Sequence, residues 1–317
     1  MSKGKVFVTD YGFKDLAQEE TLLQREGYDL YARKNSTEDE LIAEVANADA
    51  LLVQWAPVTA KVIDQLNRCK VIVRYGIGVD NVDLEAAKRK SIPVCNVPDY
   101  CIHEVADHTI SLALSLARQL AETNSRLKQG LWDIVPPRRM PAFRDMLFAT
   151  VGYGRIAREV LMRAKSLGFS VGACDPNVPD RQLRDAGVVL LKFDELVAQA
   201  DIISLHLPLS NTTHHLINRE VIGRMKTGSI LVNTSRGGLI DTNALAEAII
   251  EGKVVAGLDV FETEPIPADH PLLKAENAML TSHTAWYSER SVPTLQRMAV
   301  EEAIRGLRGE PLKNRIT

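Results

Sequence analysis

The sequence predicts an α/β protein made of two doubly wound parallel-sheet domains. Short apolar runs typical of strands alternate with amphipathic segments typical of helices, which is the pattern of a parallel sheet whose strands are connected by helices. This series starts twice, once near the N-terminus and again near residue 147. A length of 317 residues also suits about two domains.

The first series occupies about the first hundred residues. We expect strands at 6–8, 50–53 and 71–74, and helices at 14–26, 38–46 and 60–66. Gly27 is placed to end the first of these helices. The Gly76-Ile77-Gly78 turn follows the strand 71–74 at its carboxyl end, where open α/β sheets present their ligand sites.

A single long helix is predicted from about Ile102 to Lys128, with Gly130 as its stop. Its apolar positions are spaced by three and four residues and therefore fall on one face: Val105, Thr109, Leu112, Leu116 and Leu120. We interpret this stripe as a surface available to a second copy of the chain.

The second series begins after this helix. We expect strands at 147–151, 170–174, 202–205, 229–232, 254–257 and 279–281, and helices at 155–167 and 292–307. Neither a repeat of motifs nor a low-complexity tract interrupts the alternation.

Charge and hydropathy exclude two classes of partner. A formal net charge of −3 argues against a general nucleic-acid binder, because affinity for a phosphate backbone needs concentrated Lys and Arg. No apolar run approaches the roughly 18 to 20 residues that span a bilayer. We also expect neither a signal peptide nor an appended regulatory domain, and hence a cytoplasmic protein.

Cysteine and histidine patterns argue against a metal site. The four cysteines (Cys69, Cys95, Cys101 and Cys174) are scattered without a CxxC pair, which predicts reduced and mostly buried thiols. The histidines lack the spacing of zinc ligands. The adjacent pair His214-His215 would point to opposite faces of a strand, so we expect it in a loop or at a helix entrance.

A glycine-rich loop lies between a predicted strand and a predicted helix and indicates a dinucleotide site. Gly152 permits the tight turn, and Gly154 lets a pyrophosphate approach the backbone at the helix N-terminus. Asp175 ends the next strand about 20 residues further on, where a carboxylate bonds the ribose hydroxyls and favours NAD over NADP. Ala157 replaces the third glycine of the fingerprint, a change that the fingerprint tolerates.

Three further segments supply an Arg, a carboxylate and a His, in that order. They are Asn233–Gly238, Asp259–Pro265 and Ser282–Trp286. With the glycine loop, they make the chain resemble the D-isomer-specific 2-hydroxyacid dehydrogenase family over nearly its whole length. The continuation Trp286-Tyr287-Ser288-Glu289 is most similar to the branch of the C-terminal-binding proteins, corepressors built on a dehydrogenase scaffold. Thr150 stands where the family often has another glycine.

The resemblance implies a domain arrangement and a homodimer. A Rossmann-like NAD-binding domain at 100–287 would be inserted into a Rossmann-like substrate-binding domain at 1–99 plus 288–317. The helix predicted at 102–128 links the two domains in this family and contributes to the dimer interface.

Residue chemistry agrees with the roles that the resemblance implies. The Arg236 guanidinium suits a substrate carboxylate, and His283 suits proton transfer because its unperturbed pKa lies near neutrality. Glu264 would orient His283 and stabilise its imidazolium form. Main-chain N–H groups of the turn Tyr75, Gly76, Ile77 and Gly78 would complete the carboxylate site, together with Arg236 and His283.

Further residues match positions of the family that contact the cofactor. The full set is Gly152, Tyr153, Gly154, Arg155, Ile156, Asp175, Leu207, Pro208, Thr212, Thr213, Thr234, Ser235, Arg236, Asp259, His283 and Trp286. Trp286 has two interpretations, a packed aromatic beside the site or a wall that shapes the pocket.

The expected function is an NAD-dependent oxidoreductase that acts on a small 2-keto or 2-hydroxy acid. The alternative is a corepressor-like NAD(H) sensor with weak catalysis, and the same residues fit both. Gln54 and Trp55 lie in a region that faces the substrate cleft in the family, and neither is cationic, which weakens the case for a phosphorylated substrate. Arg74 keeps that case open.

Overall fold

The computed structural model describes residues 2–34, 37–136 and 138–317. It divides into two compact units, which are described separately. The first unit comprises Met1–Cys101 with Tyr287–Thr317, and the second comprises Ile102–Trp286. The sequence placed these boundaries at 99/100 and 287/288.

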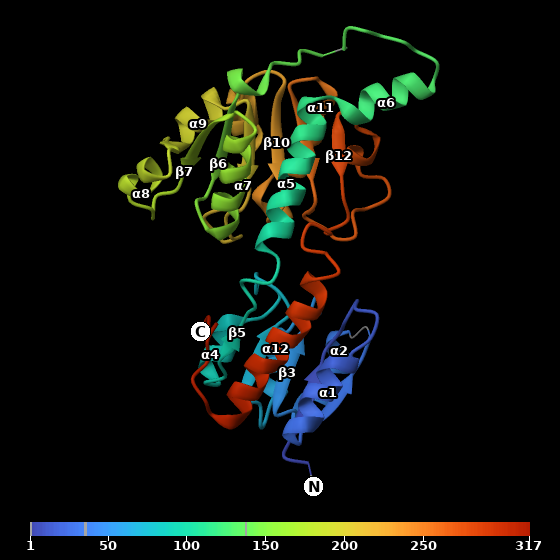
Figure 1. Cartoon of the computed structure of the whole chain (residues 1–317). Helices are drawn as coiled ribbons and strands as arrows, with labels where there is room; N and C mark the ends of the chain where they lie inside the picture. The colour runs from blue at the N-terminus through green and yellow to red at the C-terminus, as the bar shows by residue number, and fades with distance from the viewer. Residues whose placement is uncertain (1, 35–36, 137) are drawn as a thin grey trace. The chain divides into compact units, whose positions relative to one another are not determined.

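The first unit is a five-stranded parallel sheet with the order β2-β1-β3-β4-β5. Its strands are β1 Lys5–Val8, β2 Asp29–Ala32, β3 Ala50–Val53, β4 Val71–Arg74 and β5 Val94–Cys95. Its helices are α1 Ala17–Glu26, α2 Glu38–Glu44, α3 Ala60–Gln65, α4 Leu84–Arg89 and α12 Ser291–Arg308, with a 3-10 turn at Val45–Asn47. Figure 1 labels β3 and β5 of this sheet and the helices α1, α2, α4 and α12 of the same unit. The direction of the strand order reverses between β1 and β3, and ligands bind at this point in doubly wound sheets.

The second unit is a seven-stranded parallel sheet with the order β12-β11-β10-β9-β6-β7-β8. Its strands are β6 Leu147–Val151, β7 Ser170–Cys174, β8 Val189–Leu190, β9 Ile202–Leu205, β10 Ser229–Asn233, β11 Val254–Leu258 and β12 Ala278–Leu280. Its helices are α5 Ile102–Ala117, α6 Leu120–Lys128, α7 Arg155–Ser166, α8 Asp180–Asp185, α9 Phe193–Gln199, α10 Arg219–Arg224 and α11 Thr242–Ile250. Short 3-10 turns lie at Phe143–Asp145, Gly237–Leu239 and Pro271–Lys274. The predicted fold class of two doubly wound parallel sheets is confirmed.

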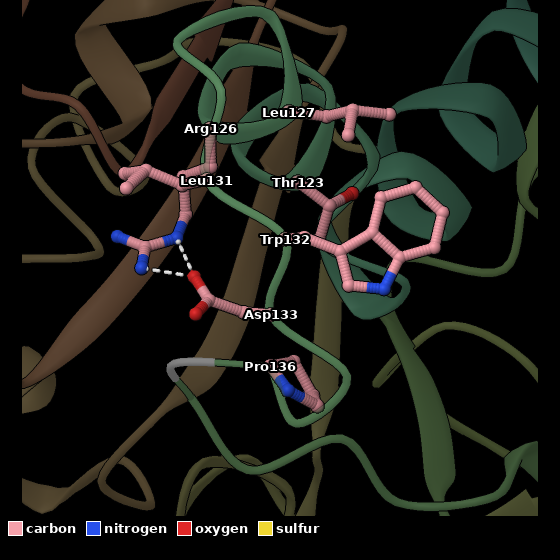
Figure 2. A pocket seen from close by; sticks show the side chains of 7 residues that line it. All are labelled: Thr123, Arg126, Leu127, Leu131, Trp132, Asp133 and Pro136. Atoms are coloured by element: carbon pink, nitrogen blue, oxygen red, sulfur yellow. Dashed lines mark hydrogen bonds and ion pairs between the residues drawn. The ribbon is translucent and has the colours of Figure 1, made fainter.

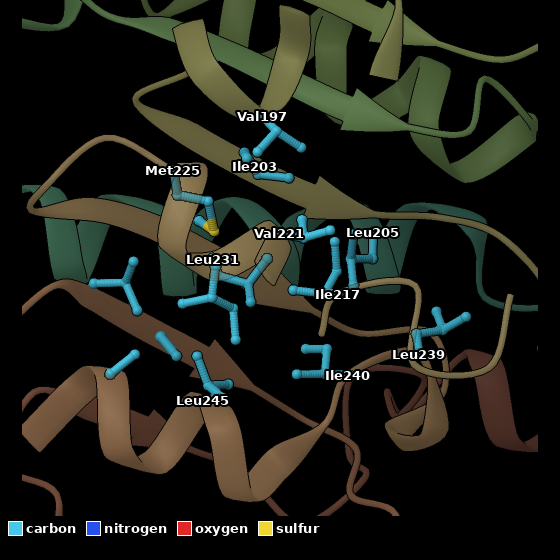
Figure 3. Packing of buried hydrophobic residues seen from close by; sticks show 14 of the residues in the cluster. Val197, Ile203, Leu205, Ile217, Val221, Met225, Leu231, Leu239, Ile240 and Leu245 are labelled. Carbon is cyan, nitrogen blue, oxygen red and sulfur yellow. The ribbon is translucent and has the colours of Figure 1, made fainter. Parts of the chain in front are cut away.

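Both faces of the second sheet are buried, which explains why its strands are almost wholly apolar. Successive residues point to opposite faces, so Ile202 packs with α5 and α7 whereas Ile203 packs with α9, α10 and α11. Figure 3 shows the second of these cores, in which Val197, Ile203 and Leu231 lie between helices and strands. These cores hold the carboxyl ends of the strands, and the loops that follow them, in fixed positions.

The predicted long helix is wrong, because it is two helices. α5 ends at Ala117 and α6 begins at Leu120. Gln119 between them adopts a left-handed φ of 50°, which a helix interior does not allow. Its buried side chain donates to the carbonyl of Arg138 at 2.9 Å and so stabilises the break with a distant segment that periodicity does not reveal.

The apolar stripe on α5 packs inside the second unit and not on a partner. Val105, Thr109, Leu112 and Leu116 are all buried, and α5 packs against α7, β10 and β11. Leu120 is the member of the predicted stripe that is exposed, and it belongs to α6. The expectation that this stripe forms a dimer interface is therefore corrected, because the stripe is already covered within the unit.

The sequence also did not predict β2, α4, β5, α8, β8, α9, α10 and α11. These elements are two to nine residues long, and periodicity does not distinguish such short segments from loops. Within the described residues, no helix combines the length and the apolar composition needed to cross a membrane.

Candidate active site

The glycine loop joins β6 to α7 at the place where the order of the second sheet reverses. Gly152 has a left-handed φ of 98°, and a Cβ atom built on it would lie 2.2 Å from the carbonyl oxygen of His206. Gly154 is the N-cap of α7, and no atom lies within 4 Å of the Cβ that it lacks. The space beside Gly154, at a helix N-terminus, is suited to a phosphate group.

Asp175 lies beside this loop. Its carboxylate accepts the Tyr153 amide at 2.8 Å and the Asn177 amide at 2.9 Å. A carboxylate offers about four acceptor positions, so acceptor capacity remains for ribose hydroxyls. Asp175, the residue expected to bind the ribose, therefore lies next to the loop expected to bind the pyrophosphate.

The two departures from the glycine fingerprint have structural explanations. The Thr150 hydroxyl donates to the carbonyl of Gly152 at 2.8 Å and so supports the tight turn. Ala157 is fully buried in the core beneath α7, where a methyl group fits. Neither change fills the space beside Gly154.

Arg236 follows β10 on a tightly bonded turn. The Asn233 side chain donates to the Arg236 carbonyl at 2.8 Å, and the Ser235 hydroxyl donates to the Leu205 carbonyl at 2.6 Å. The next residue, Gly237, packs against another loop, since a Cβ there would lie 1.9 Å from the carbonyl carbon of Phe261. This close approach brings the Arg236 turn against the segment that carries Glu264, a role of Gly237 that the sequence analysis missed.

His283 and Glu264 form a direct pair. His283 Nδ1 and Glu264 Oε2 are 2.7 Å apart, and Glu264 Oε1 accepts the Phe261 amide at 2.9 Å. His283 has a φ of 53°, which is unusual for a residue with a side chain. Such strain is concentrated at functional sites, because only surrounding contacts hold it in place.

Electrostatics connects Arg236 with this pair. Burial raises the pKa of Glu264, but the hydrogen bond and charge of His283, the Phe261 amide and the charge of Arg236 together lower that pKa below its usual value. Glu264 is therefore ionised at neutral pH and can stabilise a positive charge on His283. The structure thus brings together the Arg, the carboxylate and the His that the sequence picked out from three separate motifs.

Asp259 organises the turn that carries His283. Its buried carboxylate accepts the amides of Thr284 and Ala285, each at 2.9 Å, and the hydroxyl of Thr281 at 2.6 Å. Its carbonyl also accepts the His283 amide at 2.8 Å. Asp259 therefore bonds the chain at His283 and directly after it. This structural role is additional to the cofactor contact that the sequence suggested.

His108 on α5 extends this network and was missed by the sequence analysis. Its Nε2 lies 2.9 Å from the Thr281 hydroxyl, which in turn donates to Asp259. Thr109, the next residue, bonds Thr234 through their hydroxyls at 2.8 Å. These pairs join residues more than a hundred positions apart, so no local motif could have indicated them.

Trp286 supports the same turn from the other side. Its indole N–H donates to the carbonyl of His283 at 2.8 Å. This contact favours the interpretation of Trp286 as a packed residue that fixes the orientation of His283.

The loop after β9 is shaped by its own hydroxyl groups. The Thr213 hydroxyl donates to the Pro208 carbonyl at 2.7 Å and accepts the Ser210 amide at 2.8 Å. Leu207 and Thr212 lie in the same loop, which the resemblance implied as a cover for the cofactor.

His214 and His215 lie in a turn, and their rings stack with centroids 3.9 Å apart. With Glu262 they form a group whose donor atoms all lie within 4.8 Å of one another, a spacing that a metal ion could occupy. Glu262 already accepts the Thr242 amide at 3.1 Å and pairs with His215. The expectation of no metal stays a prediction.

In the first unit, two of the four backbone amides predicted to bind the substrate carboxylate already donate to carbonyls of the protein. The Tyr75 amide donates to the Val53 carbonyl at 2.7 Å, and the Gly76 amide donates to the Arg74 carbonyl at 2.9 Å. The Tyr75 side chain is buried and bonds Glu19 at 3.1 Å. The expectation for these two amides is therefore corrected, and the amides of Ile77 and Gly78 remain as the candidates.

The cysteines give no sign of redox chemistry. None of the four forms a disulfide, and Cys95 and Cys101 are buried. Burial raises the pKa of the Cys69 thiol to about 12, as it does for Cys95, which keeps both protonated and unreactive at neutral pH.

Comparison with known proteins now identifies the family. The NAD-binding domain of D-isomer-specific 2-hydroxyacid dehydrogenases matches residues 110–285. The chain is 38% identical over 291 residues to a hydroxypyruvate reductase from Thermotoga maritima, covering 89% of this chain and 92% of that protein. The chain belongs to the D-isomer-specific 2-hydroxyacid dehydrogenase family.

Other members of the family differ in length and in the substrate that they are named for. A D-3-phosphoglycerate dehydrogenase from Methanocaldococcus jannaschii is 39% identical over 313 residues, which are 98% of this chain but 59% of that protein. The crystal structure of D-lactate dehydrogenase from Aquifex aeolicus, complexed with NAD and lactic acid, has a TM-score of 0.88 at 28% identity and covers 96% of each chain. The family thus fixes an NAD-binding oxidoreductase scaffold and leaves the substrate open.

Proposed function

We propose that this protein is an NAD-dependent D-2-hydroxyacid dehydrogenase that works as a 2-keto acid reductase. The observation that carries the proposal is the bonded pair of His283 and Glu264, on a strained turn and within the electrostatic influence of Arg236. A general acid beside a carboxylate and a guanidinium is what reduction of a keto acid requires.

Each residue has a defined task in the proposed reaction. Arg236 and the amides of Ile77 and Gly78 hold the substrate carboxylate. His283 Nε2 gives a proton to the keto oxygen as that oxygen gains charge, while Glu264 keeps the proton of the other ring nitrogen in place. NADH, when bound, supplies the hydride to the keto carbon. We assign the first unit to substrate binding and the second to the cofactor.

The second unit fits the cofactor on its own residues. The open space at Gly154 suits the pyrophosphate, and the carboxylate of Asp175 suits the adenosine ribose. Thr234 and Asp259 are then expected near the nicotinamide half. A carboxylate at Asp175 would repel a 2′-phosphate, so the proposal includes a preference for NADH over NADPH.

Replacing Asp175 with alanine tests that preference. The variant should bind NADH about tenfold more weakly, because a hydrogen bond to a charged group contributes about 1.5 to 3 kcal/mol, part of which water replaces. It should bind NADPH no worse than the unmodified protein does, since the repulsion is gone. Fluorescence titration with both cofactors measures the ratio, and an unchanged ratio would contradict the ribose assignment.

The activity itself is tested by following NADH consumption with a panel of 2-keto acids. The panel includes glyoxylate, hydroxypyruvate, pyruvate, a branched-chain keto acid, an aromatic keto acid and 3-phosphohydroxypyruvate. Turnover of at least ~1 per second with one of them lies in the usual range of enzymes and supports the proposal. Tight NADH binding without turnover would favour the alternative, a corepressor-like NAD(H) sensor.

We further propose that the protein is a cytoplasmic homodimer, with its interface on α6 and the segment after it. Large apolar side chains are exposed there, namely Leu120, Leu127, Leu131, Trp132, Ile134 and Val135. Figure 2 shows Leu127, Leu131 and Trp132 lining a pocket beside the Arg126–Asp133 ion pair. None of the catalytic candidates lines this pocket, so its apolar character suits a protein partner better than the reacting acid.

The double substitution Leu127→Glu and Trp132→Glu should convert the dimer to a monomer, because it places four charges in the paired interface. Sedimentation velocity at micromolar concentration measures this change. Met162→Glu, at an apolar position on α7 about as exposed as Leu127, is the matched control and should stay dimeric. An unmodified protein that sediments as a monomer would refute the proposal.

A further inference from the structure

We propose that Trp55 forms the wall against which the substrate side chain packs, and that the preferred substrates are 2-keto acids with an uncharged, apolar side chain. This inference rests on the proposed function and concerns the first unit alone. A preference for apolar side chains would distinguish this chain from relatives that are named for a phosphorylated substrate.

The topology of the first sheet places Trp55 where a ligand is expected. The strand order reverses between β1 and β3, and in open α/β sheets ligands bind beyond the carboxyl ends of the strands at such a reversal. Trp55 lies two residues after the end of β3, and Gly12 lies in the loop after β1. The indole packs over Gly12, since a Cβ there would lie 2.5 Å from Cη2 of the ring. Trp55 therefore bridges the two loops at the reversal.

The proposed carboxylate site lies at the same sheet edge. β3 and β4 are neighbours, with Val53 paired to Arg74, so Trp55 and Gly76 each lie two residues beyond a paired position. The Asn81 side chain donates to the carbonyls of Gln54 and Ala56 and ties the loop after β3 to the segment after β4. A small acid held by the amides of Ile77 and Gly78 would therefore extend its side chain close to Trp55.

The Trp55 ring is partly exposed and packs on one side against Gly12. Trp55 is 49% exposed, and its backbone amide donates to the buried carboxylate of Asp10 at 2.7 Å. With its backbone bonded to Asp10 and one part of the ring against Gly12, the indole presents an apolar surface. Covering such a surface with an apolar side chain removes it from water and favours binding.

The same loop lacks the groups that a phosphate needs. Gln54, the residue before Trp55, is buried, and its side-chain oxygen accepts the Gly12 amide at 2.8 Å. Asp10 adds a negative charge that would repel a second anion near this loop. The Arg74 guanidinium packs against Gly76, since a Cβ there would lie 1.5 Å from Nη1. Its positive charge is therefore next to the turn, where it suits the one carboxylate that every 2-keto acid carries.

The test compares kcat/KM for 4-methyl-2-oxopentanoate, phenylpyruvate, glyoxylate and 3-phosphohydroxypyruvate. We expect the unmodified protein to prefer the two apolar acids. Trp55→Ala should lower kcat/KM for them by about 10- to 100-fold, mainly through KM, as is usual for loss of a hydrophobic contact. Glyoxylate has no side chain to reach the ring, so its kcat/KM should change far less.

Two more variants separate a direct contact from a general disturbance. Gly12→Ala keeps the indole but displaces its ring, so it should shift specificity in the same direction as Trp55→Ala. Tyr31→Ala removes an exposed aromatic of the same unit, on the outermost strand β2, and should change none of the four values.

Each other outcome counts against the inference. The highest kcat/KM with 3-phosphohydroxypyruvate would overturn it while leaving the proposed dehydrogenase intact. An equal loss for all four acids in Trp55→Ala would show that Trp55 only supports the fold. No turnover with any keto acid would refute the proposed function, and the inference with it.

Discussion

His283→Ala should lower kcat by about 10²- to 10⁴-fold, the usual contribution of a positioned acid or base, while NADH binds almost as before. In the proposed reaction, the proton for the keto oxygen comes from this imidazole, and neither Glu264 nor Arg236 is expected to replace it. Stopped-flow hydride transfer and fluorescence titration with NADH measure the two quantities separately. Equal loss of turnover and of NADH binding would mean that His283 is only structural.

Glu264→Gln examines the supporting half of the pair. The amide can still bond His283 Nδ1 but cannot stabilise an imidazolium, so kcat should fall by a smaller factor, about 10- to 100-fold. The surrounding groups hold the pKa of Glu264 below its usual value, so this carboxylate stays ionised to a lower pH than an ordinary glutamate does. Protonation of Glu264 should therefore reduce the activity of the unmodified protein only at a lower pH than an ordinary glutamate would.

His103→Ala is a suitable comparison for both variants. His103 is an exposed histidine on α5 that pairs with Glu159 of α7 and is not among the residues assigned to the site. Its removal should leave kcat within about twofold, in line with the small effects of most surface substitutions. A comparable loss of turnover in His103→Ala would show that the assay reports general damage.

Gly154→Ala should weaken NADH binding by at least about 100-fold without lowering thermal stability. The protein itself has room for the added methyl group, because nothing lies within 4 Å of the Cβ position, and the backbone has an ordinary negative φ. Any loss of affinity therefore reports a ligand that needs this space, as expected for a pyrophosphate that contacts the backbone. Isothermal titration with NADH and a thermal melt without NADH give the two values.

Substitutions at two other glycines serve as controls for Gly154→Ala. Gly223 in α10 also has open space at its Cβ position, so Gly223→Ala should bind NADH normally and melt at the same or a slightly higher temperature. Gly152→Ala should instead destabilise the fold even without NADH, because its Cβ meets the His206 carbonyl at a positive φ. Normal NADH binding by Gly154→Ala would contradict the pyrophosphate assignment.

Sequence patterns predicted those parts of the fold that local chemistry determines. The strands β1, β3, β6 and β9 are mostly apolar, and the glycine loop combines a required backbone conformation with an open approach. The Arg236, Glu264 and His283 group was also found, because each residue lies in a recognisable short motif. In these cases, residues that are close together in the sequence determine the local structure.

Long-range contacts decided what the sequence did not reveal. The break between α5 and α6 depends on Gln119 bonding residue 138, and the engagement of the Tyr75 amide depends on the neighbouring strand β3. The network of His108, Thr281 and Asp259 joins segments whose proximity only the folded chain creates. The apolar stripe of α5 was assigned to a partner because periodicity shows that a face is buried but not what covers it.

The most direct test of the proposed reaction is transfer of deuterium from NADH that carries it on the reactive carbon of the nicotinamide. The deuterium should appear at C2 of the 2-hydroxy acid formed from a reduced keto acid, and the product should have the D configuration. Oxidation of NADH without deuterium at C2, or an L product, would contradict the proposed hydride transfer and its stereochemistry.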